Sequence, residues 1–176
     1  MATVTNITYG TWAELTLTNL ASLANDATDP FTAWQSARID NQTATKADDF
    51  EIVMHLATSA TAPANDQALY VYLVPWVYDG STWYEGANFG TTTLPTGSEG
   101  TASISDPNGM KGPIGVPYKI TSQVLSKWFT VGSLCDGIVP DGWSLAIRNC
   151  TGAALLDDSP GTELVIAYRP ITYTLT

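Results

Sequence analysis

Residues 67–78 limit the possible folds more than any other segment, because both of their alternating sets of side chains are apolar or aromatic. The two sets are Leu69, Val71 and Leu73, and Tyr70, Tyr72, Val74 and Trp76. A strand with two apolar faces is buried on both sides. We therefore expect one set to fill the core and the other to meet a second sheet or another subunit. Pro75 predicts a strand edge or a bulge, and the following Asp79-Gly80 predicts a hairpin closed by a type I′ turn.

Apolar and polar residues alternate in several other segments, which is typical of half-buried strands. The alternation is clearest at 50–56, where one face carries Phe50, Ile52, Met54 and Leu56. Further strands are predicted at 13–20, 31–39, 143–150 and 163–176, the last of them broken at Pro170. Residues 118–131 also fit helical spacing, but their β-branched content favours strands. Residues 132–142 are typical of a turn region.

The composition agrees with an all-β protein. A chain of 176 residues is long enough for about one domain with its own core. Its 25 Thr are β-branched residues, which favour strands over helices. No repeat of fixed period is present. Eight or so strands joined by uneven loops predict an antiparallel two-sheet sandwich with Greek-key connections, similar to a jelly roll.

The chain is predicted to have two parts. Residues 1–12 form a short polar N-terminal arm, and residues 13–176 form a single β-sandwich domain. Within this domain, residues 86–117 are rich in Gly and Pro and predict a long loop with one short strand near 102–105. A loop of this length is usually functional or poorly ordered. We expect it to be a contact surface.

The charge of the chain argues against two classes of partner. Seven Lys and Arg against 17 Asp and Glu give a net charge of -10, so we expect no cationic surface for nucleic acid or for a membrane. The longest apolar stretch, 69–78, is about half of the roughly 20 residues that a membrane-spanning helix needs. The sequence starts without the basic and apolar run of a secretory signal. We therefore expect the chain to remain where it is made.

No pattern predicts catalysis, a metal site or a cofactor. His55 is the only histidine, no G-x-S-x-G motif accompanies it, and we expect it to lie beside Glu51 in a strand. Cys135 and Cys150 belong to no C-x-x-C pair, which favours reduced, partly buried thiols. Pairs of Asp in loops lack the calcium-loop pattern, which favours turn chemistry over metal binding. We predict no enzyme, although a hydrolase with paired carboxylates stays open because the sequence does not show which acids lie close together.

The six Trp and eight Tyr leave two interpretations open. If several of them are exposed together, they form a platform on which sugar rings stack, as in carbohydrate-binding modules. Packing in a core or at a subunit interface is the more common place for such residues. A cluster of exposed Trp would favour the first interpretation.

Four features together resemble the small jelly-roll decoration proteins, or cement proteins, of tailed-phage heads. They are the short polar arm, the strand Asp48-Asp-Phe-Glu-Ile-Val-Met-His-Leu, the hairpin Ala68-Leu-Tyr-Val-Tyr-Leu-Val-Pro-Trp-Val-Tyr-Asp-Gly, and the Gly/Pro/Ser loop after it. The resemblance covers residues 31–176. Components of phage tails and fibres are similar in composition.

The resemblance implies a homotrimer, made in the host cytoplasm, on the outer capsid surface of the virion. There it would bridge neighbouring major capsid subunits and stabilise the expanded shell. The net charge of -10 supports the outer surface, since it would repel packaged DNA. Trimer packing is predicted at Tyr70, Tyr72 and Trp76, and capsid contact at Val4, Ile7, Tyr9, Met110 and Ile114. The alternative function is a glycan- or receptor-binding β-sandwich module of a phage tail.

Overall fold

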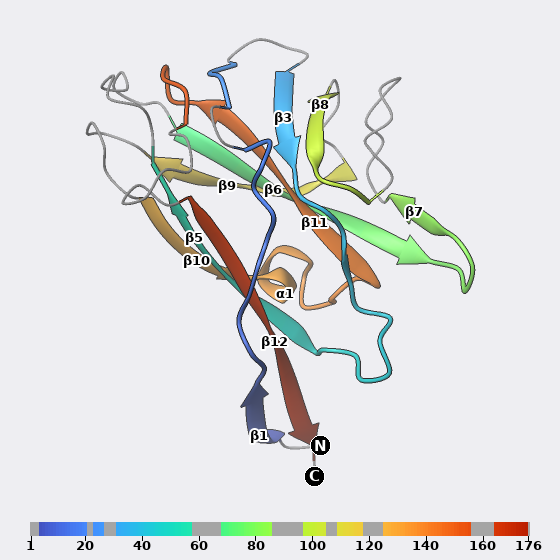
Figure 1. The fold of residues 1–176 in the computed structure, drawn as a ribbon. Helices are drawn as coiled ribbons and strands as arrows, with labels where there is room; N and C mark the ends of the chain where they lie inside the picture. The colour runs from blue at the N-terminus through green and yellow to red at the C-terminus, as the bar shows by residue number, and fades with distance from the viewer. Residues whose placement is uncertain are drawn as a thin grey trace.

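A computed structural model of the chain describes residues 4–20, 23–26, 31–57, 68–85, 97–104, 109–117, 125–155 and 164–175. These residues form two antiparallel β-sheets that pack around one main core (Figure 1). The predicted all-β, two-sheet sandwich is therefore confirmed. Within the described residues, no helix is long and apolar enough to cross a membrane.

Sheet A has the strand order β1-β12-β5-β10, and β2 also pairs with β12. Its strands are β1 (Val4–Tyr9), β2 (Ala13–Glu14), β5 (Asp49–Leu56), β10 (Leu125–Thr130) and β12 (Val165–Leu175). Both β1 and β2 lie on the side of β12 away from β5, because Ile171, the partner of Tyr9, and the two partners of β2 on β12 also pair with β5. The end of β12 and the paired β1 extend beyond the other strands (Figure 1). Residues 4–9 of the predicted arm are thus part of the sheet.

Sheet B has the strand order β7-β6-β11-β3-β8, and two further strands pair with β11 and β6. Its strands are β3 (Phe31–Gln35), β4 (Ile39–Asp40), β6 (Ala68–Tyr78), β7 (Trp83–Glu85), β8 (Gly100–Ile104), β9 (Lys111–Pro117) and β11 (Gly142–Cys150). The edge strand β9 pairs with the first half of β6, and β7 pairs with its end.

The main core lies between the inner faces of the two sheets. From β5 it receives the predicted set Phe50, Ile52, Met54 and Leu56. From sheet B it receives Leu69, Val71 and Leu73 of β6 and Trp143, Leu145 and Ile147 of β11. The period-2 predictions for these strands are confirmed, because side chains of an extended strand point alternately to its two faces.

The second apolar set of β6 is buried on the opposite face of sheet B. Tyr72, Val74 and Trp76 form a smaller cluster with Ala33, Ile104, Met110 and Ala146. Trp76 is only 3% exposed, and its indole N–H donates to Ser144 Oγ at 3.0 Å. A single chain is therefore enough to bury this face.

Two strand predictions are wrong in extent. Only Ala13–Glu14 of the predicted strand 13–20 pairs with β12, and the chain turns inward at Leu20, which is fully buried. The predicted strand 31–39 is divided into β3 and β4, because Arg38 N donates outside the strand ladder to Gly97 O at 3.0 Å.

The predicted break at Pro170 is also wrong, because β12 runs continuously through it. Pro170 O accepts a hydrogen bond from Gly10 N at 2.8 Å. In an antiparallel strand the N–H and C=O of one residue point the same way. The missing N–H of Pro170 therefore faces Gly10, in the interval between β1 and β2, and the ladder between β12 and β5 does not need it.

The described residues of the segment 86–117 form two strands, whereas one was predicted. The short strand predicted near 102–105 is confirmed as β8. The strand β9 was not predicted, because Gly112, Pro113 and Gly115 are typical of loops. β9 pairs on one side only, with β6, and an edge strand tolerates Pro. Residues 86–96 and 105–108 lie outside the described residues.

The segment 118–142 confirms one prediction and corrects another. β10 is the strand predicted within 118–131, of which residues 118–124 lie outside the described part. The helix α1 (Val131–Leu134) then forms one turn where only a turn region was predicted. Its N-cap is Thr130, whose side chain accepts a hydrogen bond from Ser133 N at 3.1 Å.

The hairpin between β6 and β7 is confirmed, with Tyr78 opposite Trp83, but the type I′ turn is wrong. That turn needs a positive φ at both central residues. Gly80 has a φ of 100°, whereas Asp79 does not have a positive φ. Instead the Asp79 carboxylate accepts hydrogen bonds from Ser81 N at 2.9 Å and Thr82 N at 2.8 Å.

Candidate functional site

Most of the large apolar side chains exposed in the described part of the chain gather on the outer face of sheet A. We call this group the aromatic face: Ile7, Tyr9, Trp12, Trp128 and Tyr173. Its orientation follows from the strand register. Since Ile52 of β5 points into the core, Val53 points outward, and Trp128 lies opposite Val53. On the other side, Tyr173 of β12 lies opposite Ile7 of β1.

Arg169 lies against two rings of the aromatic face. Its guanidinium carbon lies 4.2 Å from the ring centroid of Tyr9 and 4.7 Å from that of Trp12. On its other side Arg169 forms an ion pair with Glu51 across the β12–β5 ladder. A cation over an aromatic ring is attracted by the ring's negative face, by about 0.5–1 kcal/mol at exposed sites. One cation thus fixes the position of two aromatic rings.

Trp12 and Trp128 meet at the centre of the aromatic face. Their ring centroids are 6.4 Å apart, and the planes are inclined at 71°, an edge-to-face contact. The side chains of Ala167 and Glu51 also point to the outer face of sheet A, but they are only 7% and 9% exposed. The two indoles remain 40% and 59% exposed. The two indoles therefore form an exposed apolar surface, and the contact between them fixes their relative position.

Carboxylates surround this surface. Tyr173 N donates to Asp48 Oδ2 at 2.6 Å. Partial burial, followed by the nearby carboxylates of Asp49 and Asp48, raises the pKa of the Tyr173 hydroxyl. Glu14, exposed on β2, lies near the opposite end. Because Arg169 is already paired with Glu51, the rim of the aromatic face is acidic.

The structure brings together only two of the five residues predicted to contact a capsid. Ile7 and Tyr9 are 47% and 50% exposed and belong to the aromatic face. Met110 is buried in the smaller cluster, and Ile114 is half-buried against the main core. These two therefore offer little surface to a partner. Val4 begins β1 opposite Leu175, and its side chain lies outside the described part.

The residues predicted for trimer packing lie on the face of sheet B away from the main core. Tyr72 is 8% exposed and packs with Trp76 in the smaller cluster. Tyr70 is half-buried beside that cluster. Burial in the single chain leaves Tyr72 and Trp76 little area with which to hold a second subunit.

Sequence reasoning missed Trp12, Trp128 and Arg169 as site residues. Trp12 is the last residue of the predicted arm 1–12. Trp128 lies in the segment 118–131, whose pattern also fits helical spacing. Their meeting depends on the order β1-β12-β5-β10. The alternation within single strands carries no information on that order.

Two thiols lie outside the aromatic face in the described part of the chain. Cys135 is buried and Cys150 half-buried, and both are free, as predicted. Burial raises the pKa of each thiol, which lowers its reactivity. Among the described residues, no three His, Cys, Asp or Glu side chains come together as a metal site would require. His55 lies exposed on β5, two positions beyond Val53.

No family model, curated protein or solved structure matches this chain. The aromatic face is therefore interpreted from its own geometry.

Proposed function

We propose that this chain is a decoration protein of a tailed-phage head, which binds the outer surface of the expanded capsid and bridges major capsid subunits. The observation that supports the proposal is the aromatic face. It includes Ile7 and Tyr9 of the predicted contact arm and presents three further rings beside them. We propose that the aromatic face is the surface that docks on the capsid, and that the protein acts as a homotrimer.

The composition of the aromatic face suits a protein interface. Trp, Tyr and Arg are the residues most enriched among those that dominate binding energy. Full burial of one large apolar side chain contributes about 1.5–3 kcal/mol. A ligand that binds only the expanded shell stabilises that shell by mass action. Several rings buried together would therefore stabilise the expanded state by purely non-covalent contacts.

The net charge supports the outer surface of the shell. A chain with a net charge of -10 is repelled by packaged DNA. The acidic rim formed by Asp48, Asp49 and Glu14 favours a partner with Lys or Arg around an apolar centre. We propose that the major capsid protein presents such a surface only after expansion.

Cosedimentation with heads of the phage that encodes the chain tests the proposal. The protein is expected to bind expanded heads and not unexpanded ones, and Trp128→Ala is expected to weaken binding at least tenfold. Ile138→Ala is the matched control, since Ile138 is 75% exposed and is not one of the residues of the aromatic face. Equal binding of Trp128→Ala and wild type would reject the docking surface, and no binding to expanded heads would reject the function. Light scattering tests the expected threefold mass.

A glycan-binding module of a phage tail is the second candidate, because Trp12 and Trp128 are exposed together. Against it, the angle of 71° between the indoles prevents them from forming one flat stacking platform. A glycan array probed with the labelled protein distinguishes the two functions. Saturable glycan binding that Trp128→Ala removes, without binding to heads, would favour this candidate.

A further inference from the structure

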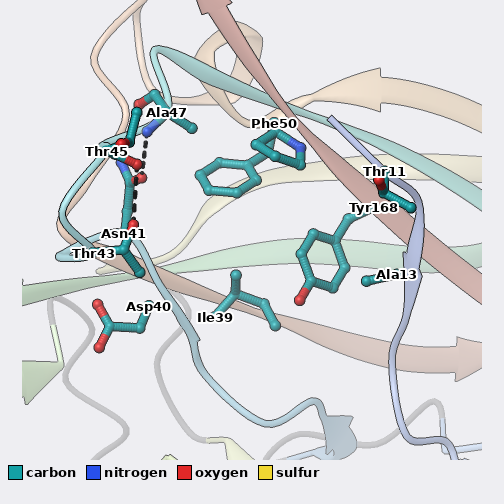
Figure 2. A pocket seen from close by; sticks show the side chains of 11 residues that line it. Thr11, Ala13, Ile39, Asp40, Asn41, Thr43, Thr45, Ala47, Phe50 and Tyr168 are labelled. Atoms are coloured by element: carbon teal, nitrogen blue, oxygen red, sulfur yellow. Dashed lines mark hydrogen bonds between the residues drawn. The ribbon is translucent and has the colours of Figure 1, made fainter. Parts of the chain in front are cut away.

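A cavity of about 280 Å³ lies behind the aromatic face, between the segment Thr11–Ala13, the loop that follows β4 and the middle of β12 (Figure 2). Thr11 and Ala13 line it, whereas Trp12 between them belongs to the aromatic face. The cavity and the aromatic face therefore lie on opposite sides of one extended segment. The volume is slightly below the roughly 300–1,000 Å³ of sites for drug-sized ligands, so any ligand must be small.

Two aromatic rings form the apolar wall of this cavity. Phe50 and Tyr168 have centroids 6.2 Å apart and planes inclined at 56°. Both rings are backed by the fully buried Trp143, at 5.5 Å from Phe50 and 5.4 Å from Tyr168. Ile39 and Pro170 complete the apolar lining. Trp143 packs against both rings, and Phe50 is only 5% exposed, so the apolar surface that a ligand can reach is mainly that of Tyr168, Ile39 and Pro170.

Polar groups lie around the rest of the cavity. They come from Thr11, Asp40, Asn41, Thr43, Thr45 and Tyr168. Figure 2 shows the Tyr168 hydroxyl directed toward Ile39, and no hydrogen bond joins it to another described residue. Burial alone raises the pKa of this hydroxyl, so it is a neutral donor and acceptor at neutral pH. Asp40 Oδ1 accepts from Gln42 N at 2.6 Å, which leaves its second oxygen available.

The loop side of the cavity is held by a reciprocal pair of hydrogen bonds. Asn41 Nδ2 donates to Ala47 O at 3.2 Å, and Ala47 N donates to Asn41 Oδ1 at 2.9 Å (Figure 2). The Asn41 side chain thereby closes the loop that carries Thr43 and Thr45. Thr43 Oγ1 also donates to Thr45 O at 3.0 Å. The loop is thus held in place before a ligand binds, which lowers the entropic cost of ordering it.

The charges of the lining restrict the ligand class. None of the described lining residues is Lys, Arg or His, and Asp40 is acidic, so a phosphate or carboxylate ligand would find no cationic partner in the lining and would be repelled by Asp40. A purely apolar ligand would remove water from Asp40 and the hydroxyls without replacing its hydrogen bonds, which is unfavourable. A ring with an apolar face and several hydroxyls satisfies both kinds of lining.

We propose that this cavity binds one neutral hexopyranose ring, with its apolar face against Tyr168, Ile39 and Pro170 and its hydroxyls bonded to Asp40 and to the Tyr168 hydroxyl. The inference is independent of capsid binding. It also differs from the glycan platform considered above, because the apolar contact is in the cavity and not on the aromatic face.

Nuclear magnetic resonance of the ¹⁵N-labelled full chain tests the proposal. The probes are the methyl glycosides of glucose, galactose and mannose, and N-acetylglucosamine, each added singly. We expect at least one to bind saturably with a Kd of about 1 mM, a strength typical of a ligand of this size. The indole N–H signal of Trp143, one of six Trp, is expected to shift with the same Kd. If none of the four probes binds, the proposal is wrong.

Two conservative variants locate the site. Tyr168→Phe keeps the ring and removes the hydroxyl, and Asp40→Asn removes the charge of an exposed side chain. Each is expected to raise the Kd about threefold to tenfold, because Tyr168→Phe removes one hydrogen bond and Asp40→Asn weakens a charge-assisted one. Tyr9→Phe, on the aromatic face, is the matched control and should not change the Kd.

Other outcomes overturn the proposal. Sugar binding that Trp128→Ala abolishes and that Tyr168→Phe leaves unchanged would place the site on the aromatic face. Binding of p-cresol at the Trp143 signal, with no response to any sugar, would show that the cavity accepts apolar rings instead. Failure to bind phage heads would not affect the proposal, so the two functions are tested separately.

Discussion

Arg169 and Glu51 lie opposite each other on β12 and β5 and form an ion pair that water reaches only in part, with side-chain exposures of 22% and 12%. The same arginine lies against Tyr9 and Trp12. Removing one partner of such a pair leaves the other charge poorly solvated and unpaired. The pair therefore links the stability of sheet A to the geometry of the aromatic face.

We expect Arg169→Met to lower the free energy of unfolding by about 3 kcal/mol. The double variant Arg169→Met/Glu51→Leu should recover part of this loss, because it leaves no unpaired charge. Urea unfolding of wild type, both single variants and the double variant measures the coupling. A double variant whose loss equals the sum of the single losses would show that the ion pair contributes no coupling.

The contact of Gly10 with Pro170 predicts that a larger residue at position 10 destabilises the protein. A Cβ on Gly10 would lie 2.5 Å from Pro170 Cγ, which forces the connection between β1 and β2 away from β12. We expect Gly10→Ala to destabilise the protein by about 1–3 kcal/mol, as overpacking does. Gly115→Ala is the matched control, because no atom lies within 4 Å of its Cβ. Thermal unfolding of both variants makes the comparison, and equal melting temperatures would contradict the prediction.

The side chain of Asn149 is fully buried and holds two loops together. Its removal is therefore expected to destabilise the protein. Its Nδ2 donates to Leu23 O at 2.8 Å and to Ala153 O at 2.7 Å, and its Oδ1 accepts from Thr151 Oγ1 at 2.7 Å. We expect Asn149→Ala to cost about 3–4 kcal/mol, since several buried groups lose their partners. Asn6→Ala, at an exposed position of β1, should cost less than about 0.5 kcal/mol. Chemical denaturation measures both, and a neutral Asn149→Ala would reject this role.

Glu85 predicts a dependence of stability on pH. Burial raises the pKa of its carboxyl from 4.5 to about 7, although a hydrogen bond from Gln35 lowers it in part. Since the folded state holds the proton more tightly than the unfolded state, the free energy of unfolding falls as pH rises from about 4.5 to about 7. After allowance for partial exposure, we expect a loss of about 1–2 kcal/mol.

Glu85→Gln should remove this contribution. We expect it to be more stable than wild type at pH 8 and close to wild type below pH 4.5. Glu14→Gln serves as the control, because Glu14 is exposed on β2. Urea unfolding at several pH values gives the comparison. Parallel pH profiles for wild type and Glu85→Gln would show that Glu85 does not titrate in this range.

The sequence predicted the local properties of the strands well. The alternation at 50–56 correctly indicated which side chains of β5 enter the core, and the two apolar sets of 67–78 correctly indicated a strand buried on both faces. It failed where tertiary partners decide the local structure. Pro170 continues a strand because its missing N–H faces an interval between two neighbours, and β9 forms because β6 offers an unpaired edge.

The sequence alone determined that this chain is an all-β sandwich, because the direction of side chains along an extended strand is a local property with a period of two. Only the tertiary structure decides where the aromatic face and the cavity form. Trp12 meets Trp128, and Tyr168 faces the loop closed by Asn41, only because strands distant in the sequence are neighbours in sheet A or lie across the sandwich. That order results from the simultaneous burial of all apolar faces, which depends on the whole chain and not on any one segment.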